Sequence, residues 1–566
     1  MLLNIHDLSI TFPSGHGTVQ AVKNVSLHIA PGETLGLVGE SGSGKSVTAL
    51  SIMGLLPHPA QVSGNFQYTP NQKPETSKPE TLNPEPFKPE NHRGKEIAMI
   101  FQEPMTSLNP VFRCGYQVTE AIRLHQRTTA SQAREQALVL FEKVKFEDPE
   151  RIFRAYPHEL SGGQKQRVMI AMALAGQPRL LIADEPTTAL DVTVQKTILD
   201  LLQELRADTG LAMLFISHDL GVISEIADRV LVMRQGQIVE TGSASKVLEN
   251  PEHPYTRGLL ACRPSLHQKV HRLPTVQDYL NDNTVQPVLV RPSETAERRA
   301  DLLRHSPLLE IKNVSVHYPV RRHFWETGSQ SVKALQEVSF EVFPGEIFGL
   351  AGESGCGKTT LGRVISRLLR PSEGSVWYRK LNLETLPAIN FRPLRREIQM
   401  VFQDPYSSLN PRMPIGEALL EGMRTYQLHG SEQRRREMAA ELLKKVGLEV
   451  DHARRLPHEF SGGQRQRICL ARALALQPKL LVCDEVVSAL DVSVQADILN
   501  LLLDLQRDFG LTYLFISHDL SVIRQMCDRV LVMHQGRIEA LGHPEVLFEN
   551  PENEYVRALL EAVPGK

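Results

Sequence analysis

The sequence lacks any hydrophobic run long enough to cross a membrane. Across its 566 residues there is no stretch of about 18 consecutive apolar side chains. The first residues, MLLNIHDLSITF, also lack the basic region and apolar block of a signal peptide. We therefore expect any role at a membrane to depend on a partner protein.

Excess charge and paired cysteines are absent too. Lysine and arginine total 63 against 65 acidic residues, so the charge balance gives no electrostatic argument for binding nucleic acid. The six cysteines form no CxxC pair, which argues against a zinc site or a disulfide framework and favours reduced thiols in a cytosolic protein. The length of the chain predicts at least two domains.

A long internal repeat accounts for most of the chain. LSGGQKQR at 160–167 returns as FSGGQRQR at 460–467, and LFISHDL at 214–220 returns at 514–520. Both pairs are 300 residues apart, which indicates two homologous units. We expect residues 1–262 and 308–566 to form the two domains, with 263–307 as a linker containing one short helix.

The first unit carries an insertion that the second lacks. Lys45 and Gln102 are 57 positions apart, whereas their counterparts Lys358 and Gln403 are 45 apart, a difference of 12. The surplus falls in residues 69–91, which repeat KPE or NPE without apolar periodicity. This composition predicts a disordered insertion, and a role in recognition is the alternative.

A phosphate-binding loop is predicted in each unit. GESGSGKS at 39–46 and GESGCGKT at 352–359 fit G-x-x-x-x-G-K-[ST], with a short apolar run before the first and a helical stretch after it. Main-chain N–H groups of such a loop and the following helix N-terminus bind phosphate. Lys45 and Lys358 would then reach the β- and γ-phosphates, and Ser46 and Thr359 would ligate Mg²⁺.

Acidic pairs end two buried apolar runs, LLIAD and LLVCD. Asp184-Glu185 and Asp484-Glu485 would lie at the carboxyl ends of strands, where α/β sheets bind their ligands. The aspartate suits contact with Mg²⁺, and the glutamate can polarise an attacking water. Strands alternating with helical stretches favour an α/β fold with parallel strands.

The repeated SGGQ segment stands at the start of a predicted helix. Ser161 is the expected N-cap, and exposed glycine amides at a helix N-terminus favour an anion. Each unit already has a phosphate loop, so we infer that SGGQ binds the far side of a nucleotide held by the other unit. The alternative, an ordinary capped helix with a glycine turn, is less consistent with its duplication beside two phosphate loops.

Together, the phosphate loop, SGGQ, acidic strand end and SHD resemble the ATP-binding cassette (ABC) family over nearly the whole chain. The resemblance implies an α/β fold of two P-loop NTPase (RecA-like) nucleotide-binding domains in tandem, each with an antiparallel β subdomain and a helical subdomain. It implies two ATP molecules between units paired head to tail. It also implies that Gln102 and Gln403 contact Mg²⁺ and water and that Phe12 and Tyr318 stack on adenine.

The site residues so predicted fall into three groups. The catalytic residues are Glu185, His218, Glu485 and His518. The Mg²⁺ ligands are Ser46, Gln102, Asp184, Thr359, Gln403 and Asp484. The ATP-binding residues are Phe12, Gly39, Glu40, Ser41, Gly42, Ser43, Gly44, Lys45, Ser46, Gln102, Ser161, Gly162, Gly163, Gln164, Tyr318, Gly352, Glu353, Ser354, Gly355, Cys356, Gly357, Lys358, Thr359, Gln403, Ser461, Gly462, Gly463 and Gln464.

Two finer features resemble the ATPases of bacterial oligopeptide, dipeptide and nickel importers. SLNP follows both glutamines, and an HPYTRGLL tail lies within 250–262. The resemblance implies peripheral location on the cytoplasmic face of the bacterial inner membrane. It also implies two integral-membrane permeases and, through them, a periplasmic or extracellular substrate-binding protein, without nucleic acid or direct substrate contact. Dipeptide, oligopeptide, glutathione, peptide antibiotic and nickel all stay open as substrates.

The second unit departs from the family pattern at one place. Val486-Val487 replace the Pro-Thr usual after the catalytic glutamate. Both sites are expected to hydrolyse ATP because both glutamates and both histidines are present, but whether their rates are equal stays open.

The rival class is a soluble tandem-cassette ATPase acting on ribosomes, but such proteins usually have a long, charged, helical linker. Here the linker is interrupted by proline, and the SLNP and HPYTR features favour the importer.

Overall fold

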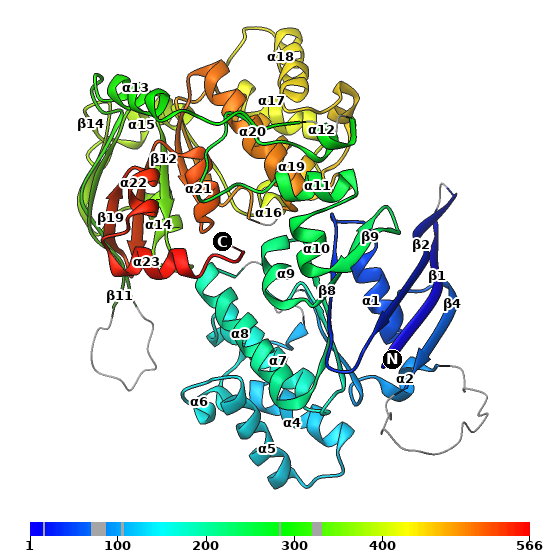
Figure 1. Ribbon diagram of the computed structural model, residues 1–566. Helices are drawn as coiled ribbons and strands as arrows, with labels where there is room; N and C mark the ends of the chain where they lie inside the picture. Colours follow the sequence, from blue (N-terminus) through cyan, green and yellow to red (C-terminus); the bar gives the residue numbers. More distant parts are fainter. Residues whose placement is uncertain are drawn as a thin grey trace, which may run out of the picture. The chain divides into compact units, whose positions relative to one another are not determined.

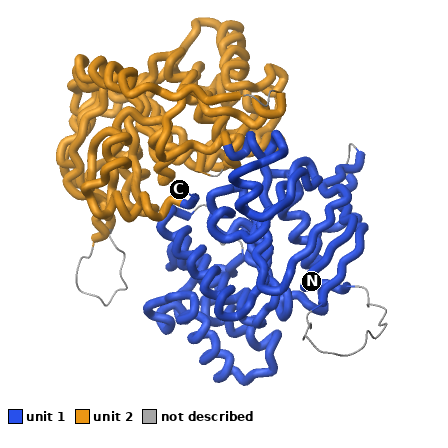
Figure 2. The backbone as a smooth tube through the Cα atoms, viewed as in Figure 1, with its two compact units in different colours: residues 1–260, 564–566 blue, residues 261–563 orange. Residues whose placement is uncertain are grey.

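The computed structural model describes residues 1–14, 17–69, 87–102, 107–188, 190–281, 285–319, 331–488 and 490–565. The chain divides into two compact units, residues 1–260 with 564–566 and residues 261–563 (Figure 2). Most of the predicted insertion, 70–86, and a smaller extra piece of the second unit, 320–330, lie outside the described residues.

The first unit is built on a six-stranded sheet in the order β5-β6-β7-β3-β8-β9. Its strands are β3 (Thr34–Val38), β5 (Ile97–Ile100), β6 (Leu180–Asp184), β7 (Ala212–Ser217), β8 (Arg229–Arg234) and β9 (Gln237–Ser243). All neighbouring pairs are parallel except β8 and β9. β3, β5, β6 and β7 are buried at every position, as parallel strands covered on both faces require.

An antiparallel sheet of order β2-β1-β4 packs beside α1 (Figure 1). Its strands are β1 (Leu3–Ser14), β2 (Gly17–Ile29) and β4 (Gln61–Tyr68), and α1 spans Lys45–Met53. Alternate residues of β1, including Leu3 and Ile5, share one apolar core with Leu35 and Leu180 of the parallel sheet. This shared core fixes the antiparallel sheet against the phosphate loop that precedes α1.

Helices between β5 and β6 form a separate subdomain (Figure 1). They are α4 (Cys114–His125), α5 (Ala130–Lys143), α6 (Pro149–Arg154), η1 (Pro157–Glu159) and α7 (Gly162–Leu174). The remaining helices are α2 (Pro89–His92), α8 (Val192–Thr209), α9 (Leu220–Ile226), α10 (Ala244–Glu249) and α11 (Pro254–Ala261). Each unit therefore has the three parts that the resemblance predicted, since the second repeats them.

The second unit has a parallel-type sheet β15-β16-β17-β12-β18-β19 and an antiparallel sheet β11-β10-β13-β14. Its strands are β10 (Leu309–Pro319), β11 (Ser331–Val342), β12 (Ile347–Ala351), β13 (Glu373–Tyr378), β14 (Leu381–Asn382), β15 (Ile398–Val401), β16 (Leu480–Asp484), β17 (Thr512–Ile516), β18 (Arg529–His534) and β19 (Arg537–Gly542). Its helices are α14 (Lys358–Ile365), α15 (Ala388–Glu397), α16 (Pro405–Ser408), α17 (Ile415–Thr425), α18 (Glu432–Lys445), η2 (Val450–Arg454), η3 (Pro457–Glu459), α19 (Gly462–Leu474), α20 (Val492–Phe509), α21 (Leu520–Met526), α22 (Pro544–Glu549) and α23 (Glu554–Glu561).

The predicted linker is part of the second unit and holds two helices, α12 (Val276–Asn281) and α13 (Pro292–Leu302), rather than one. The buried amide of Asn500 accepts from Leu273 N at 2.9 Å and donates to Leu273 O at 2.8 Å. Gln525 makes the same pair of bonds with Val270, at 3.0 and 2.7 Å. The two buried side-chain amides thus supply the hydrogen-bond partners that a neighbouring strand would give to the main chain of Val270 and Leu273.

Both ends of the predicted disordered insertion, residue 69 and residues 87–91, are structured. Thr69 N donates to Leu2 O at 2.9 Å, so the segment still continues the sheet there. Phe87 stacks on Phe66 with ring centroids 5.8 Å apart, and α2 begins at Pro89. The aromatic contact gives residues 87–91 an apolar anchor that the KPE repeats lack.

All six cysteines are buried and none forms a disulfide, in agreement with the sequence. Within the described ranges no helix has the length and apolar character needed to cross a bilayer.

Candidate functional site

The phosphate loop of the first unit lies between the end of β3 and the start of α1. Gly44 has φ 108°, and a Cβ there would meet Ala21 O at 2.7 Å, so the turn requires glycine. Lys45 is only 4% exposed, and its Nζ donates to Gly39 O at 2.7 Å and to Glu40 O at 2.9 Å. A buried ammonium held by main-chain carbonyls at a helix N-terminus is suited to an anionic ligand.

The acidic end of β6 faces this loop. Ser46 Oγ donates to Asp184 Oδ1 at 3.1 Å. Burial raises the pKa of Asp184 to about 6, although the hydrogen bond from Ser46 opposes the rise. A divalent cation beside the hydroxyl and the carboxylate would favour the ionised form, so these two oxygen ligands fit Mg²⁺.

Glu185 follows Asp184 with a left-handed backbone, φ 50°, which turns its carboxylate away from that of its neighbour. Its Oε2 accepts from Gln102 Nε2 at 3.0 Å and from Thr188 Oγ1 at 3.0 Å, and His218 Nδ1 lies 3.1 Å away. Burial by itself raises the pKa of Glu185, but His218, Lys45 and Thr188 together lower it to about 2. The carboxylate is therefore ionised at neutral pH.

The second unit reproduces this arrangement. Lys358 Nζ donates to Gly352 O at 2.7 Å and to Glu353 O at 2.8 Å. Thr359 Oγ1 donates to Asp484 Oδ1 at 2.9 Å, and burial again raises the pKa of that aspartate. The structure thus places corresponding predicted residues together in each unit.

The predicted catalytic glutamate of the second unit, Glu485, is held by fewer groups than Glu185. Glu485 Oε2 accepts from Gln403 Nε2 at 2.8 Å, and His518 Nδ1 lies 3.5 Å away. Ser488 donates instead to the main-chain oxygen of Glu485, at 3.0 Å. Burial raises the pKa of Glu485, but His518 and Lys358 outweigh it and the net shift is downward. The hydroxyl contact that Thr188 makes has no counterpart among the described contacts of Ser488.

The SGGQ segments begin α7 and α19, and the predicted N-cap is confirmed. Ser161 Oγ accepts from Gln164 N at 3.3 Å, and Gln164 Oε1 accepts from Ser161 N at 3.1 Å. Ser461 and Gln464 form the same capping box. A Cβ on Gly163 would lie 2.4 Å from Val194 Cγ1, so glycine allows α7 to pack closely on α8 while Ser161 stays exposed.

The two aromatic residues expected at adenine lie near the ends of β1 and β10. Phe12 is half-buried opposite Val19, and Tyr318 is 39% exposed opposite Val332. Their stacking on adenine stays a prediction.

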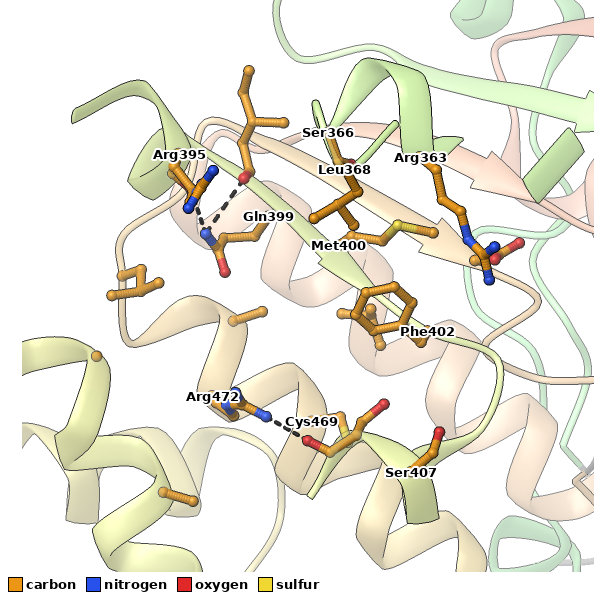
Figure 3. Close-up of a pocket in the computed structure, with 18 of the residues that line it drawn as sticks. Arg363, Ser366, Leu368, Arg395, Gln399, Met400, Phe402, Ser407, Cys469 and Arg472 are labelled. Atoms are coloured by element: carbon orange, nitrogen blue, oxygen red, sulfur yellow. Dashed lines mark hydrogen bonds between the residues drawn. The ribbon is translucent and has the colours of Figure 1, made fainter. Parts of the chain in front are cut away.

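A groove of about 830 Å³ opens beside Gln403 in the second unit. Arg363 comes to it from α14, Arg395 from α15 and Phe402 from the end of β15, and Cys469 and Arg472 come from α19 (Figure 3). Met400 and Leu368 give it an apolar surface. The groove therefore joins the glutamine of the site to the helical subdomain.

Sequence reasoning missed three residues that touch the sites. Thr188 binds the Glu185 carboxylate, and the hydroxyls of Tyr255 and Tyr555 accept from the main chain of the two phosphate loops. The repeated tyrosine of the HPYTRGLL and NEYVRALL tails was the available signal.

Comparisons with known proteins identify the family of the chain. The family described as ABC transporter matches residues 22–188 and 335–488, and the one described as oligopeptide/dipeptide transporter, C-terminal region, matches 239–285. Proteins called "Glutathione import ATP-binding protein GsiA" are similar along the whole chain. That of Pectobacterium atrosepticum is 44% identical over 566 residues, and that of Escherichia coli K12 is 45% identical over 573, each comparison covering 100% of this chain and 89% of the relative.

Among solved structures, the ATP-binding cassette MJ0796, a dimer bound to ADP and Pi, is 31% identical, with a TM-score of 0.38 over 42% of this chain and 98% of that one. The ribosome-acting alternative finds no support among these relatives. Two complete copies of the phosphate loop, acidic strand end and SGGQ helix stand in one polypeptide, which belongs to the ABC transporter family as a tandem ATPase.

Proposed function

We propose that the protein is the ATP-hydrolysing subunit that powers import of small peptides, or a related substrate, through a membrane ABC transporter. The importer-type tail at 239–285 and the relatives named for glutathione import support this proposal. Glutathione is itself a small peptide, so we place the substrate in that class.

The observation that carries the enzymatic part is the cluster around each catalytic glutamate. Gln102, Thr188 and His218 all approach the same oxygen, Oε2 of Glu185. We therefore assign the other oxygen, Oε1, to the attacking water. An ionised carboxylate held this way can accept a proton from that water or orient it.

ATP and Mg²⁺ would be held by the residues around each phosphate loop. Lys45 and Lys358 each donate to two loop carbonyls, and the third N–H of each ammonium would reach the β- and γ-phosphates. Ser46 with Asp184, and Thr359 with Asp484, would hold Mg²⁺, with Gln102 and Gln403 beside them. When bound, Mg²⁺ supplies positive charge that offsets the charge developing on the phosphate oxygens.

The SGGQ segments, in which the serine and the first glycine are exposed, would complete the sites across the two units. Ser461–Gln464 would cover the nucleotide of the first phosphate loop, and Ser161–Gln164 that of the second. ATP would touch both units when they are closed, whereas ADP lacks the γ-phosphate, so ATP favours the closed state and hydrolysis reverses that preference. The cycle of closing and parting would drive transport.

The partners in this proposal are two integral-membrane permeases and, through them, a substrate-binding protein. The ATPase would lie on the cytoplasmic face of the bacterial inner membrane without touching the cargo. The groove beside Gln403 joins a nucleotide site to the helical subdomain, to which we assign the contact with the permeases. It is therefore suited to transmit the state of the site (Figure 3).

Purification from the native host tests the proposal directly. The protein should co-purify with two hydrophobic permeases, and vesicles containing the assembly should take up glutathione or a di- or tripeptide when ATP is present. Chains with Glu185→Gln and Glu485→Gln should assemble but not transport. Co-sedimentation with ribosomes, with normal peptide uptake in cells lacking the protein, would contradict it.

A further inference from the structure

A tyrosine from the tail of each unit reaches its phosphate loop. Tyr255, on α11, is fully buried, and its hydroxyl accepts a hydrogen bond from Glu40 N at 3.1 Å. Tyr555, on α23, accepts from Glu353 N at 3.3 Å. Because Glu40 and Glu353 are the second residues of the two loops, the contact is the same in both units.

The bonded N–H belongs to a peptide group whose other end holds the loop lysine. Gly39 C=O and Glu40 N–H share one planar, trans peptide and point in opposite directions. Gly39 O accepts from Lys45 Nζ at 2.7 Å, while Glu40 N donates to the tyrosine. The tyrosine hydroxyl and the lysine ammonium therefore bind opposite edges of the same planar peptide group.

The second unit has the same chain of contacts. Lys358 Nζ donates to Gly352 O at 2.7 Å, and Glu353 N of that peptide donates to Tyr555. The duplication matters because two units with different tail sequences keep the tyrosine and the peptide that it binds.

Each tyrosine ring is itself fixed by the end of a core strand. The Arg234 guanidinium, at the end of β8, lies 5.1 Å from the centroid of the Tyr255 ring. The His534 ring, at the end of β18, lies 4.2 Å from that of Tyr555. Burial also raises the pKa of the Tyr255 hydroxyl, so this group stays neutral at physiological pH. The buried Tyr255 hydroxyl therefore has little freedom to leave the loop.

We propose that Tyr255 and Tyr555 are positioning residues that orient the first peptide plane of each phosphate loop and, through it, the lysine that meets the triphosphate. The tail would then set the affinity for ATP without touching it. The proposal rests on the assignment of the loops as ATP sites. Its failure would leave the proposed transport function standing, because transport needs ATP hydrolysis but not the hydrogen bond between each tyrosine and its loop.

A matched control exists for the loss of a buried tyrosine hydroxyl. Tyr513, on β17, is fully buried, and its hydroxyl donates to Leu502 O at 2.9 Å, a main-chain group outside the phosphate loop. Tyr513→Phe and Tyr555→Phe therefore each remove, from the same unit, one tyrosine hydroxyl that is hydrogen-bonded to the main chain. Only the second touches the loop.

The test compares full-length chains with Tyr255→Phe, Tyr555→Phe, both changes together, and Tyr513→Phe. Loss of one hydrogen bond per loop should raise the KM for ATP of the double variant by about 2- to 12-fold, with kcat within about twofold. Hydrogen exchange of peptides spanning 39–46 and 352–359 should accelerate in the tyrosine-tail variants. Tyr513→Phe should change neither quantity.

Two results would overturn the proposal. One is an unchanged KM and unchanged exchange in the double variant, which would make the tyrosines ordinary core residues. The other is an equal rise in KM in Tyr513→Phe, which would attribute the effect to general loosening. If the double variant is poorly folded, the single variants decide, since each leaves one intact loop for comparison.

Discussion

Replacing Glu185 and Glu485 together with glutamine should nearly abolish ATP hydrolysis while preserving ATP binding. Glutamine has the same length, and its amide oxygen can still accept from Gln102, but it has no charge with which to take a proton from water. Loss of a general base lowers the rate by about 10²–10⁴-fold, equivalent to about 2.7–5.4 kcal/mol in the barrier at about 1.36 kcal/mol per tenfold. The contacts of Lys45 and Ser46 are left in place.

Phosphate release at saturating ATP measures the rate, and retention of ATP after rapid gel filtration measures binding. Glu204→Gln is the control, since Glu204 lies in an exposed ion pair with Lys145. A double variant that hydrolyses ATP at a near wild-type rate would refute the assignment of the base. One that no longer retains ATP would show that the carboxylates support binding rather than chemistry.

Three further changes probe other parts of the structure. Thr188→Val should slow the first site about 2- to 12-fold by removing a hydrogen bond to the catalytic carboxylate, whereas Ser488→Ala should leave the second site within about twofold; turnover is measured in chains whose other site carries Glu→Gln. Asn500→Ala should lower the free energy of unfolding of the second unit by about 2–4 kcal/mol in urea denaturation, because both main-chain groups of Leu273 lose their partner. Burial lowers the pKa of His543, so the unfolded chain binds the proton first and stability falls as pH drops below about 6.5; His543→Gln should flatten that fall.

Each of these has a contrary result. Equal slowing by the two hydroxyl changes would remove the asymmetry between the sites. Gln277→Ala, on the surface of α12, is the control for Asn500→Ala, and equal losses from both would mean that the buried amide contributes nothing special. An unchanged pH slope after His543→Gln would assign the acid sensitivity to other groups.

The sequence was sufficient for the fold because its strongest signals are local. The left-handed turn before α1 requires a glycine, Gly44, and the acidic pair at Asp184 follows a buried strand. Each motif therefore also indicates the helix or strand beside it. The three-part architecture came from family resemblance, since periodicity alone does not separate an antiparallel sheet from a parallel one in β1. The site residues gathered in each unit are those that stand at the carboxyl ends of strands.

What the sequence did not reveal depends on contacts distant along the chain. Tyr255 is 215 residues from Glu40, and a hydroxyl bound to a main-chain N–H leaves no sequence pattern between them. The Asn500 amide that pairs with Leu273 looks from the sequence like one more polar residue in an amphipathic helix. Thr188 and Ser488 differ by one methyl group, yet their hydroxyls choose different acceptors.

The stretch containing Val270 and Leu273, which Gln525 and Asn500 hold in place, changes where the boundary between the two cassettes lies. The importer tail matches 239–285, but from residue 261 onward that stretch folds with the second unit. A recombinant exchange of cassettes with a relative should therefore be joined near 261. A junction near 307 would replace Val270 and Leu273 with residues of the relative and so change the main-chain partners of the buried Asn500 and Gln525 amides.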